Sequence, residues 1–295
     1  MPGILIGWRR HRFAAAIALL LLAVARLAAS QALPVGEHVV HREVSPWQTL
    51  VVVDSPTRRC LRFGDGAGQF NQSCRLRARP AHLAFDYTRA MVATLLLWDP
   101  PPSRVLLIGV GGGSIASALA TVRPEMTLDA VDIDEAVLRI AETFFGLRPG
   151  PNLRLHAADG RDFVAAARAR EEWFDAVLLD AFDADGIPPA LFTEVFLREI
   201  RALLSPAGVF LANTFSGSPS AAQELAAAKS AFGRVYSVRQ GKGAGNRLIV
   251  AASSPERLLS VAALRTALPA QRASLARVGI EESWVRRLAF ADFEP

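Results

Sequence analysis

The chain is poor in cysteine, in histidine and in net charge, and each shortage excludes a class of protein. Two cysteines in 295 residues cannot supply the two C-x-x-C pairs of a zinc module. The five histidines are scattered, and His38 and His41 have no third ligand near them in the sequence, so we expect no metal site. Residues 1–30 hold four arginines and no acid, which leaves about +1 of the formal charge of +5 for the rest of the chain. So small a basic excess argues against nucleic acid as a partner.

The rest of the composition is that of an ordinary folded protein. The chain is 51% hydrophobic and 21% charged, which excludes a disordered or collagenous chain. A protein of this length buries roughly 75% of the surface of its unfolded chain. We therefore expect one large domain with a small additional unit.

The N-terminal segment has the pattern of a secretory signal. The basic stretch Arg9-Arg10-His11-Arg12 precedes thirteen apolar residues, 13–25, and small residues end at Ser30-Gln31-Ala32. A basic start, an apolar run of this length and a small-x-small site are typical of a signal peptide, here cut after Ala32. An uncleaved N-terminal membrane anchor and a non-functional extension remain alternatives. The leader favours an exported, periplasmic or membrane-anchored protein, and no later run is long enough to span a bilayer.

Three parts follow from the pattern along the chain: a signal peptide or anchor over 1–32, a small β domain over 33–80, and a Rossmann-like cofactor-binding catalytic domain over 81–295. Short strands are expected at 49–53, 59–63 and 69–75. A hairpin centred near Ala67 would set Cys60 opposite Cys74, as a disulfide in an exported chain or otherwise as two half-buried thiols. A helix is expected over 81–97.

The large domain alternates strand, loop and helix. Strands are expected at 104–108, 127–131, 153–156, 174–179 and 208–213, with helices between most of them. Such alternation specifies a parallel sheet covered by helices on both faces. Strands 235–238 and 247–251 are joined so closely that they must be antiparallel. The expected fold is thus α/β, a mostly parallel seven-stranded sheet with a reversed last strand, as in S-adenosylmethionine-dependent transferases, plus a small N-terminal β-hairpin appendage. Residues 255–290 are expected to be amphipathic helix.

A glycine turn and a series of acids mark a candidate site. The turn runs from Gly109 through Gly111, Gly112 and Gly113 to Ser114, between a strand and a helix, where backbone N–H groups can face a ligand. Asp132, Asp159 and Asp180 follow three further strands. Because the carboxyl ends of parallel strands meet at one edge, these acids should surround one cleft. We interpret Asp134 and Asp162 as helix N-caps or turn formers, and Trp47 and Trp173 as core residues rather than stacking platforms.

The ordered series resembles the spermidine synthase (polyamine aminopropyltransferase) family over about residues 45–252. The matching segments are Ser45-Pro46-Trp47-Gln48, the strand and glycine loop at 105–113, Val131-Asp132-Ile133-Asp134, Asp159-Gly160-Arg161-Asp162-Phe163, and Asp180 to Asp183 with Pro188 to Phe192. The resemblance implies a cytoplasmic enzyme, a homodimer assembled partly through the β appendage, and a small amine as substrate.

The same resemblance assigns roles to residues. Gln48 and Asp132 would hold the ribose of decarboxylated S-adenosylmethionine, and Asp159 with Gly160 the adenine. Asp180 would accept the proton of the attacking amine, and Asp183 and Tyr87 would bind that amine. An alkyl amine is mostly protonated near pH 7, so a carboxylate is needed to orient and deprotonate it.

Two departures from the family alter this assignment. Gly112 stands where the family has an Asp that grips the amine of the decarboxylated cofactor, and Tyr87-Thr88-Arg89 replaces Tyr-His-Glu. Without that acid, the loop no longer repels a carboxylate, so ordinary S-adenosylmethionine would fit it at least as well as the decarboxylated form. Three hypotheses follow: an aminopropyltransferase, an S-adenosylmethionine-dependent methyltransferase, and an exported non-catalytic binding protein on the same fold.

Overall fold

The computed structural model describes residues 36–64, 70–182, 186–239, 245–254, 261–286 and 289–292. The predicted leader, Asp183 and most of the loop around Lys242 lie outside these ranges. Within the described residues, no helix combines the length and the apolar character needed to cross a membrane.

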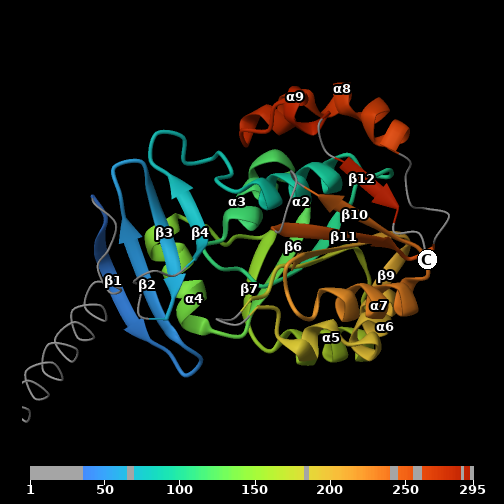
Figure 1. Ribbon diagram of the computed structural model, residues 1–295, viewed down its shortest axis with the longest axis horizontal. Coiled ribbons are helices and arrows are strands. Elements are labelled where there is room, and N and C mark those ends of the chain that lie inside the picture. Colours follow the sequence, from blue (N-terminus) through green and yellow to red (C-terminus); the bar gives the residue numbers. More distant parts are fainter. Residues whose placement is uncertain are drawn as a thin grey trace, which may run out of the picture.

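The N-terminal unit is a four-stranded antiparallel sheet in the order β1-β2-β3-β4 (Figure 1). Its strands are β1 (His38–Val44), β2 (Thr49–Asp54), β3 (Arg58–Phe63) and β4 (Asn71–Leu76). Three of them were predicted; β1 was missed, because its three valines do not alternate with polar residues, and none of its side chains is buried. Cys60 pairs with Cys74 in the register of β3 and β4, and the two form a disulfide. Of the two predicted alternatives, a disulfide and two half-buried thiols, the disulfide is the one found.

The large sheet has the order β12-β10-β11-β9-β8-β5-β6-β7. Its parallel strands are β5 (Arg104–Ile108), β6 (Thr127–Asp132), β7 (Leu153–Ala157), β8 (Phe174–Leu179) and β9 (Leu204–Phe215). Beyond them, β11 (Asn246–Ala252) runs antiparallel to both β9 and β10 (Val235–Arg239). The predicted seven-stranded sheet with its reversed last strand is confirmed. An eighth strand, β12 (Ala289–Asp292), is added at the edge against β10.

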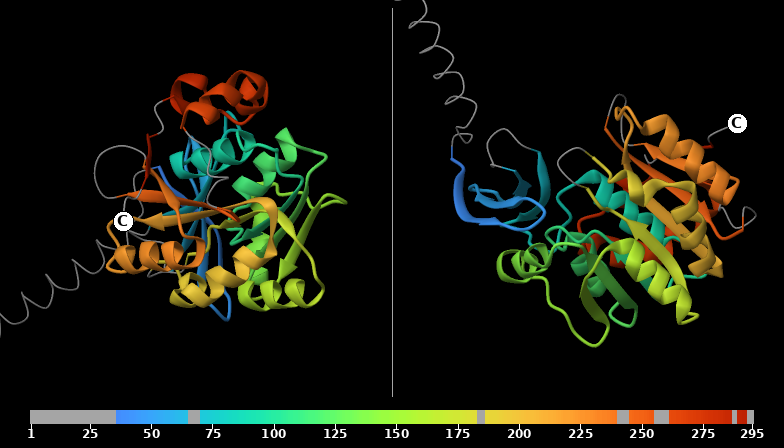
Figure 2. Two further views of the ribbon diagram at one scale, coloured as in Figure 1. Left: turned by 90° about the vertical axis from the view of Figure 1, so that its right-hand side faces the viewer. Right: turned by 90° about the horizontal axis from the view of Figure 1, so that it is seen from below.

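Helices cover both faces of the large sheet (Figures 1 and 2). On one face lie α2 (Asp86–Leu96), α3 (Ser114–Val122) and α8 (Val261–Arg277); on the other lie α5 (Gly160–Ala169), α6 (Glu194–Leu203) and α7 (Ala221–Phe232). Two of these differ from expectation: α7 was not predicted, and the helix expected over 255–290 is instead α8, the short α9 (Glu282–Val285) and β12. Two separate apolar clusters, one on each face, form the core.

The small sheet packs on the large domain through α4 (Glu135–Ile140) and the π-helical turn η1 (Ala141–Phe145) that continues it. Leu50, Val52 and Leu61 of the small sheet form a cluster with Val137 and Ile140 of α4. Burying five such side chains contributes roughly 1.5–3 kcal/mol each. This contact fixes the small sheet beside the carboxyl ends of the parallel strands.

Candidate active site

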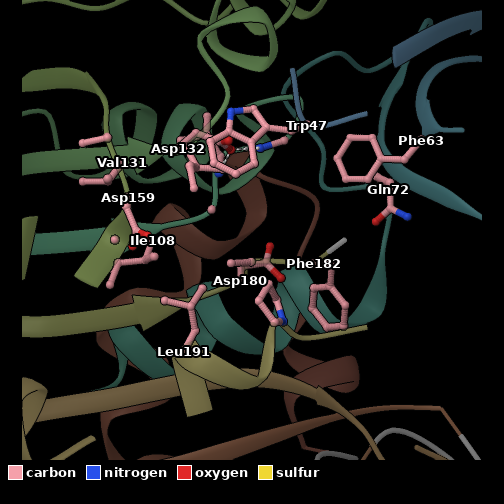
Figure 3. Close-up of a pocket in the computed structure, with 18 of the residues that line it drawn as sticks. Trp47, Phe63, Gln72, Ile108, Val131, Asp132, Asp159, Asp180, Phe182 and Leu191 are labelled. Carbon is pink, nitrogen blue, oxygen red and sulfur yellow. Dashed lines mark hydrogen bonds between the residues drawn. The ribbon is translucent and has the colours of Figure 1, made fainter. Parts of the chain in front are cut away.

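A cavity of about 370 Å³ opens between the small sheet and the carboxyl ends of β5, β6, β7 and β8 (Figure 3). The strand order reverses between β5 and β8, the point where open parallel sheets bind ligands. Most of the predicted site residues line the cavity: Gln48, Tyr87, Gly109, Gly111, Asp132, Asp159, Gly160 and Asp180. Gly112 and Gly113 are not among the lining residues, and Asp183 lies outside the described part of the chain.

Asp132 organises the glycine turn. Its Oδ2 accepts a hydrogen bond from the Val110 backbone N–H at 2.9 Å, and its Oδ1 accepts one from the Asp134 N–H at 3.1 Å. Burial raises the pKa of Asp132 above its ordinary value, although these N–H donors oppose the rise. Oδ2 also accepts a longer hydrogen bond from the Gly111 N–H at 3.5 Å, whereas Oδ1 keeps a second lone pair. The Asp132 Oδ1 atom can therefore still accept a hydrogen bond from a bound hydroxyl.

The turn between β1 and β2 places Gln48 and Trp47 at the cavity. Ser45 Oγ donates to Asp134 Oδ2 at 2.6 Å, and the Gln48 N–H donates to Ser45 Oγ at 3.1 Å. Asp134 in turn caps α4 by accepting from the Ala136 N–H, as predicted. One serine thus ties the small sheet to the helix that follows Asp132. The physical role of the Ser-Pro-Trp-Gln segment is therefore to hold Gln48 and Trp47 beside the start of α4.

Trp47 was predicted to be a core residue, and this is wrong. Trp47 is 59% exposed and lines the cavity, as Asp132 does (Figure 3). Trp173 is also 49% exposed, on the opposite end of the sheet from the cavity, just before β8. Both predictions relied on hydrophobicity alone. Each tryptophan lies in a connection at the end of a strand, where a large side chain is packed on only part of its surface.

Asp159 and Gly160 begin α5. The Asp159 carboxylate caps the helix through the Arg161 N–H at 2.8 Å and forms an ion pair with the Arg161 guanidinium at 3.0 Å. These contacts hold the pKa of Asp159 below its ordinary value. A Cβ on Gly160 would lie 2.6 Å from Ile108 Cγ2, so glycine allows the helix to approach β5. The helix start brings its backbone N–H groups to the cavity wall.

Asp180 lies at the end of β8 in the middle of the cavity (Figure 3). Its Oδ1 accepts from Asn213 Nδ2 at 2.8 Å, and its Oδ2 accepts from the Tyr87 hydroxyl at 3.4 Å. Burial raises the pKa of Asp180 to about 7, against the opposing effect of the Asn213 and Tyr87 hydrogen bonds. Burial and the neighbouring Asp180 charge also raise the pKa of Tyr87. A carboxyl group with this pKa can exchange a proton near neutral pH.

Sequence reasoning missed several residues of the site. Phe63 of β3, Gln72 of β4 and Phe182 line the cavity on the side of Asp180, and Asn213 binds Asp180 from β9. Asn213 could have been found from the sequence, because the strand predicted over 208–213 ends at this residue. That strand is parallel to β8, so Asn213 lies beside Asp180 at the end of β8. Phe63 and Gln72 gave no such signal, since they come from the small sheet.

Gly112 faces the small sheet. A Cβ at this position would lie 2.7 Å from Ser73 Oγ and 3.0 Å from Phe145 Cδ1. Gly113 has a φ of +72° and lies against Leu147. Close packing is therefore the observed role of both glycines. In the described residues, no group of three or more His, Cys, Asp or Glu side chains forms a metal site.

Comparisons with known proteins agree with this arrangement. The family model for the spermine/spermidine synthase domain matches residues 84–237. A polyamine aminopropyltransferase from Vibrio vulnificus is 39% identical over 213 residues, which cover 72% of this chain and 71% of the relative. The chain spans about half the length of further curated relatives with the same name.

Two solved structures share the fold. A probable spermidine synthase from Corynebacterium glutamicum is 21% identical, with a TM-score of 0.64 over 86% of this chain and 94% of that one. Human Methyltransferase-like protein 13, in complex with SAH, is 27% identical, with a TM-score of 0.60 over 65% of this chain and 93% of that one. The fold thus occurs with both kinds of transferase, whereas the curated relatives at 37–40% identity are named polyamine aminopropyltransferases. The chain belongs to the spermine/spermidine synthase family.

Proposed function

We propose that the protein transfers an aminopropyl group from decarboxylated S-adenosylmethionine to a small amine. The observation that carries this proposal is Asp180, a carboxyl group with a pKa of about 7 in a cavity that also holds the glycine turn and Asp132. Family membership and the Vibrio relative support the reaction type. The acceptor is a small molecule, since the cavity volume is about 370 Å³.

In this reaction, the nitrogen of the acceptor amine attacks the carbon next to the sulfonium. A C–N bond forms, the C–S bond breaks, and a neutral thioether leaves. Ionised Asp180 attracts the amine and takes up the proton that the nitrogen loses. Gln48 and Asp132 would hold the ribose, Asp159 and Gly160 the adenine, and Tyr87 and Asp183 would contact the amine; no metal takes part in this scheme.

Calorimetry with the two cofactor forms tests the proposal. We expect the purified protein to bind decarboxylated S-adenosylmethionine more tightly than S-adenosylmethionine, because a carboxylated tail would bring a second negative charge beside the buried Asp180 carboxylate. The loop at Gly112, which has no acid, does not contribute to this preference. A clear preference for the carboxylated form would remove the aminopropyl assignment. Product analysis after incubation with the preferred form and a set of diamines completes the test.

Methyl transfer is the second candidate function, and the residue at position 112 favours it. Gly112 has no carboxylate, and a longer side chain there would meet Ser73 and Phe145, so this part of the loop has no acid to hold a cationic tail. The similarity to human Methyltransferase-like protein 13 shows that a relative of this fold binds SAH. Labelled product from methyl-labelled S-adenosylmethionine and cell extract would support this candidate.

We also infer that the protein works in an oxidising compartment, outside the cytoplasm. The disulfide between Cys60 and Cys74 supports this inference, since such bonds persist mainly in exported proteins, and so does the signal-like sequence before residue 33. An alkaline phosphatase reporter fused after residue 40 should be active, whereas the same fusion lacking residues 1–32 should be inactive. Equal inactivity of both fusions would contradict export. The homodimer and membrane attachment also remain predictions.

A further inference from the structure

Asp180 is connected to the surface by two amide side chains that the proposed reaction does not use. Asn213 Nδ2 donates to Asp180 Oδ1 at 2.8 Å, and Asn246 Nδ2 donates to Asn213 Oδ1 at 3.0 Å. Asn213 is 1% exposed, whereas Asn246 is exposed at the start of β11. The row of hydrogen bonds therefore runs from solvent to the buried carboxyl group.

The register of the sheet explains why the two amides meet. Asn213 pairs with Leu248 and Phe215 pairs with Asn246 in the β9–β11 ladder. Asn246 is thus the diagonal neighbour of Asn213 on the same face of the sheet, within reach of a long side chain. No backbone shift is needed to form the contact.

The chemistry of an amide makes this contact directional. A side-chain amide offers donors on one end and an acceptor on the other. With the Asn213 oxygen occupied by the Asn246 donor, the Asn213 nitrogen must face Asp180, where it favours the ionised carboxylate. If Asn213 turned over, its oxygen would face Asp180 Oδ1, which is favourable only when that carboxyl group carries a proton.

We propose that Asn246 is a positioning residue that fixes the orientation of the Asn213 amide and thereby controls the protonation state of Asp180. The proposal deepens the proposed function, because it assigns control of the base to a residue outside the cavity. Titratable groups that line the cavity with Asp180 in the described residues are Tyr87 of α2, Asp132 at the end of β6, and Asp159 with Arg161 at the start of α5. None of them contacts Asn246 through a hydrogen bond or ion pair in the structure described.

An acceptor-only side chain at position 246 tests the proposal. In Asn246→Asp the Asn213 nitrogen is drawn toward residue 246, so we expect the pKa of Asp180 to rise by about one, the order of a lost hydrogen bond to a charged group. The measurement is a titration of the ¹³C-labelled carboxyl resonance of Asp180 in the free full-length protein, assigned by its loss in Asp180→Asn. The acid limb of the kcat/KM profile should move by the same amount.

Phe215→Asp is the matched control for charge. Phe215 lies directly opposite Asn246, is 44% exposed and takes no part in the hydrogen bonds to Asp180. We expect this variant to raise the pKa of Asp180 by no more than a few tenths, because exposed charges are screened. In an Asn213→Leu background, Asn246→Asp should have only this smaller effect. If Asn213→Leu does not fold, the comparison of the two single variants decides.

Equal shifts in Asn246→Asp and Phe215→Asp, or no shift in Asn246→Asp, would overturn the proposal. The titration needs no substrate, so its outcome is separate from the question of the reaction. If the titration behaves as expected while no aminopropyl transfer is found, the proposed function fails and the role of Asn246 stands.

Discussion

Asp180→Asn is expected to lower kcat by at least about 100-fold, and by up to about 10,000-fold, while cofactor affinity changes little. The substitution keeps the shape of the side chain but removes the group that accepts the proton, and general-base catalysis contributes about this much. In the part of the chain that the structure describes, the Asp180 side chain forms hydrogen bonds with Tyr87 and Asn213, and not with the residues assigned to ribose or adenine. Steady-state kinetics with the cofactor form preferred in calorimetry measures the loss.

The pH dependence gives this prediction a second measurement. Because the pKa of Asp180 is about 7, kcat/KM of the wild-type protein should rise with pH up to about 7 and then level off, and the variant should lose this limb. Asp162→Asn is a suitable control, since Asp162 is exposed in the first turn of α5 and does not line the cavity. A variant at 180 that kept the wild-type rate would contradict the assignment of the base.

Stability should change in the opposite direction from activity. The folded pKa of Asp180 lies above its ordinary value of 3.8, so the folded protein binds more protons than the unfolded chain between these two pH values. The contribution of this group to stability is therefore fully present below pH 3.8 and lost as the pH rises through about 7. At pH 8 the Asn variant should be at least as stable as the wild type to urea. Inactivity combined with retained stability would assign the loss to chemistry.

The part of the site that lies at strand ends could be predicted from the sequence. Asp132, Asp159 and Asp180 each follow a buried apolar run, and parallel strands bring the ends of such runs to one edge regardless of the details of packing. The glycine turn at 109 was visible for the same reason. These predictions need only the position of each strand end in the sequence, because the parallel sheet places all of these ends at the same edge.

Residues contributed by other elements could not be predicted in the same way. Phe63 and Gln72 reach the cavity only because the small sheet docks on α4, and this docking depends on contacts far apart in the sequence. The link from Asn246 to Asn213 depends on the register of β9 and β11, which a one-residue slip would abolish. Trp47 was placed wrongly because its exposure is set by the turn and not by its hydrophobicity.

Gly109→Ala is expected to destabilise the fold by about 2–6 kcal/mol and to displace Asp180. Gly109 has a φ of +90°, a conformation that costs other residues about 1–3 kcal/mol. A Cβ there would lie 2.4 Å from the Asp180 carbonyl oxygen and 2.7 Å from Ala181 Cα, both backbone atoms that cannot turn aside. Relieving such a contact adds about 1–3 kcal/mol. Urea unfolding monitored by circular dichroism measures the change in free energy.

Gly150→Ala separates this effect from the general cost of replacing a glycine. No atom lies within 4 Å of a Cβ built on Gly150, so we expect its free energy of unfolding to change by no more than about 0.5 kcal/mol. If Gly109→Ala were equally harmless, β5 would not be held to β8 as closely as the Asp180 N–H to Ile108 O hydrogen bond of 2.8 Å requires. The backbone at Gly109 would then not be what positions Asp180, and the base would lose its structural support.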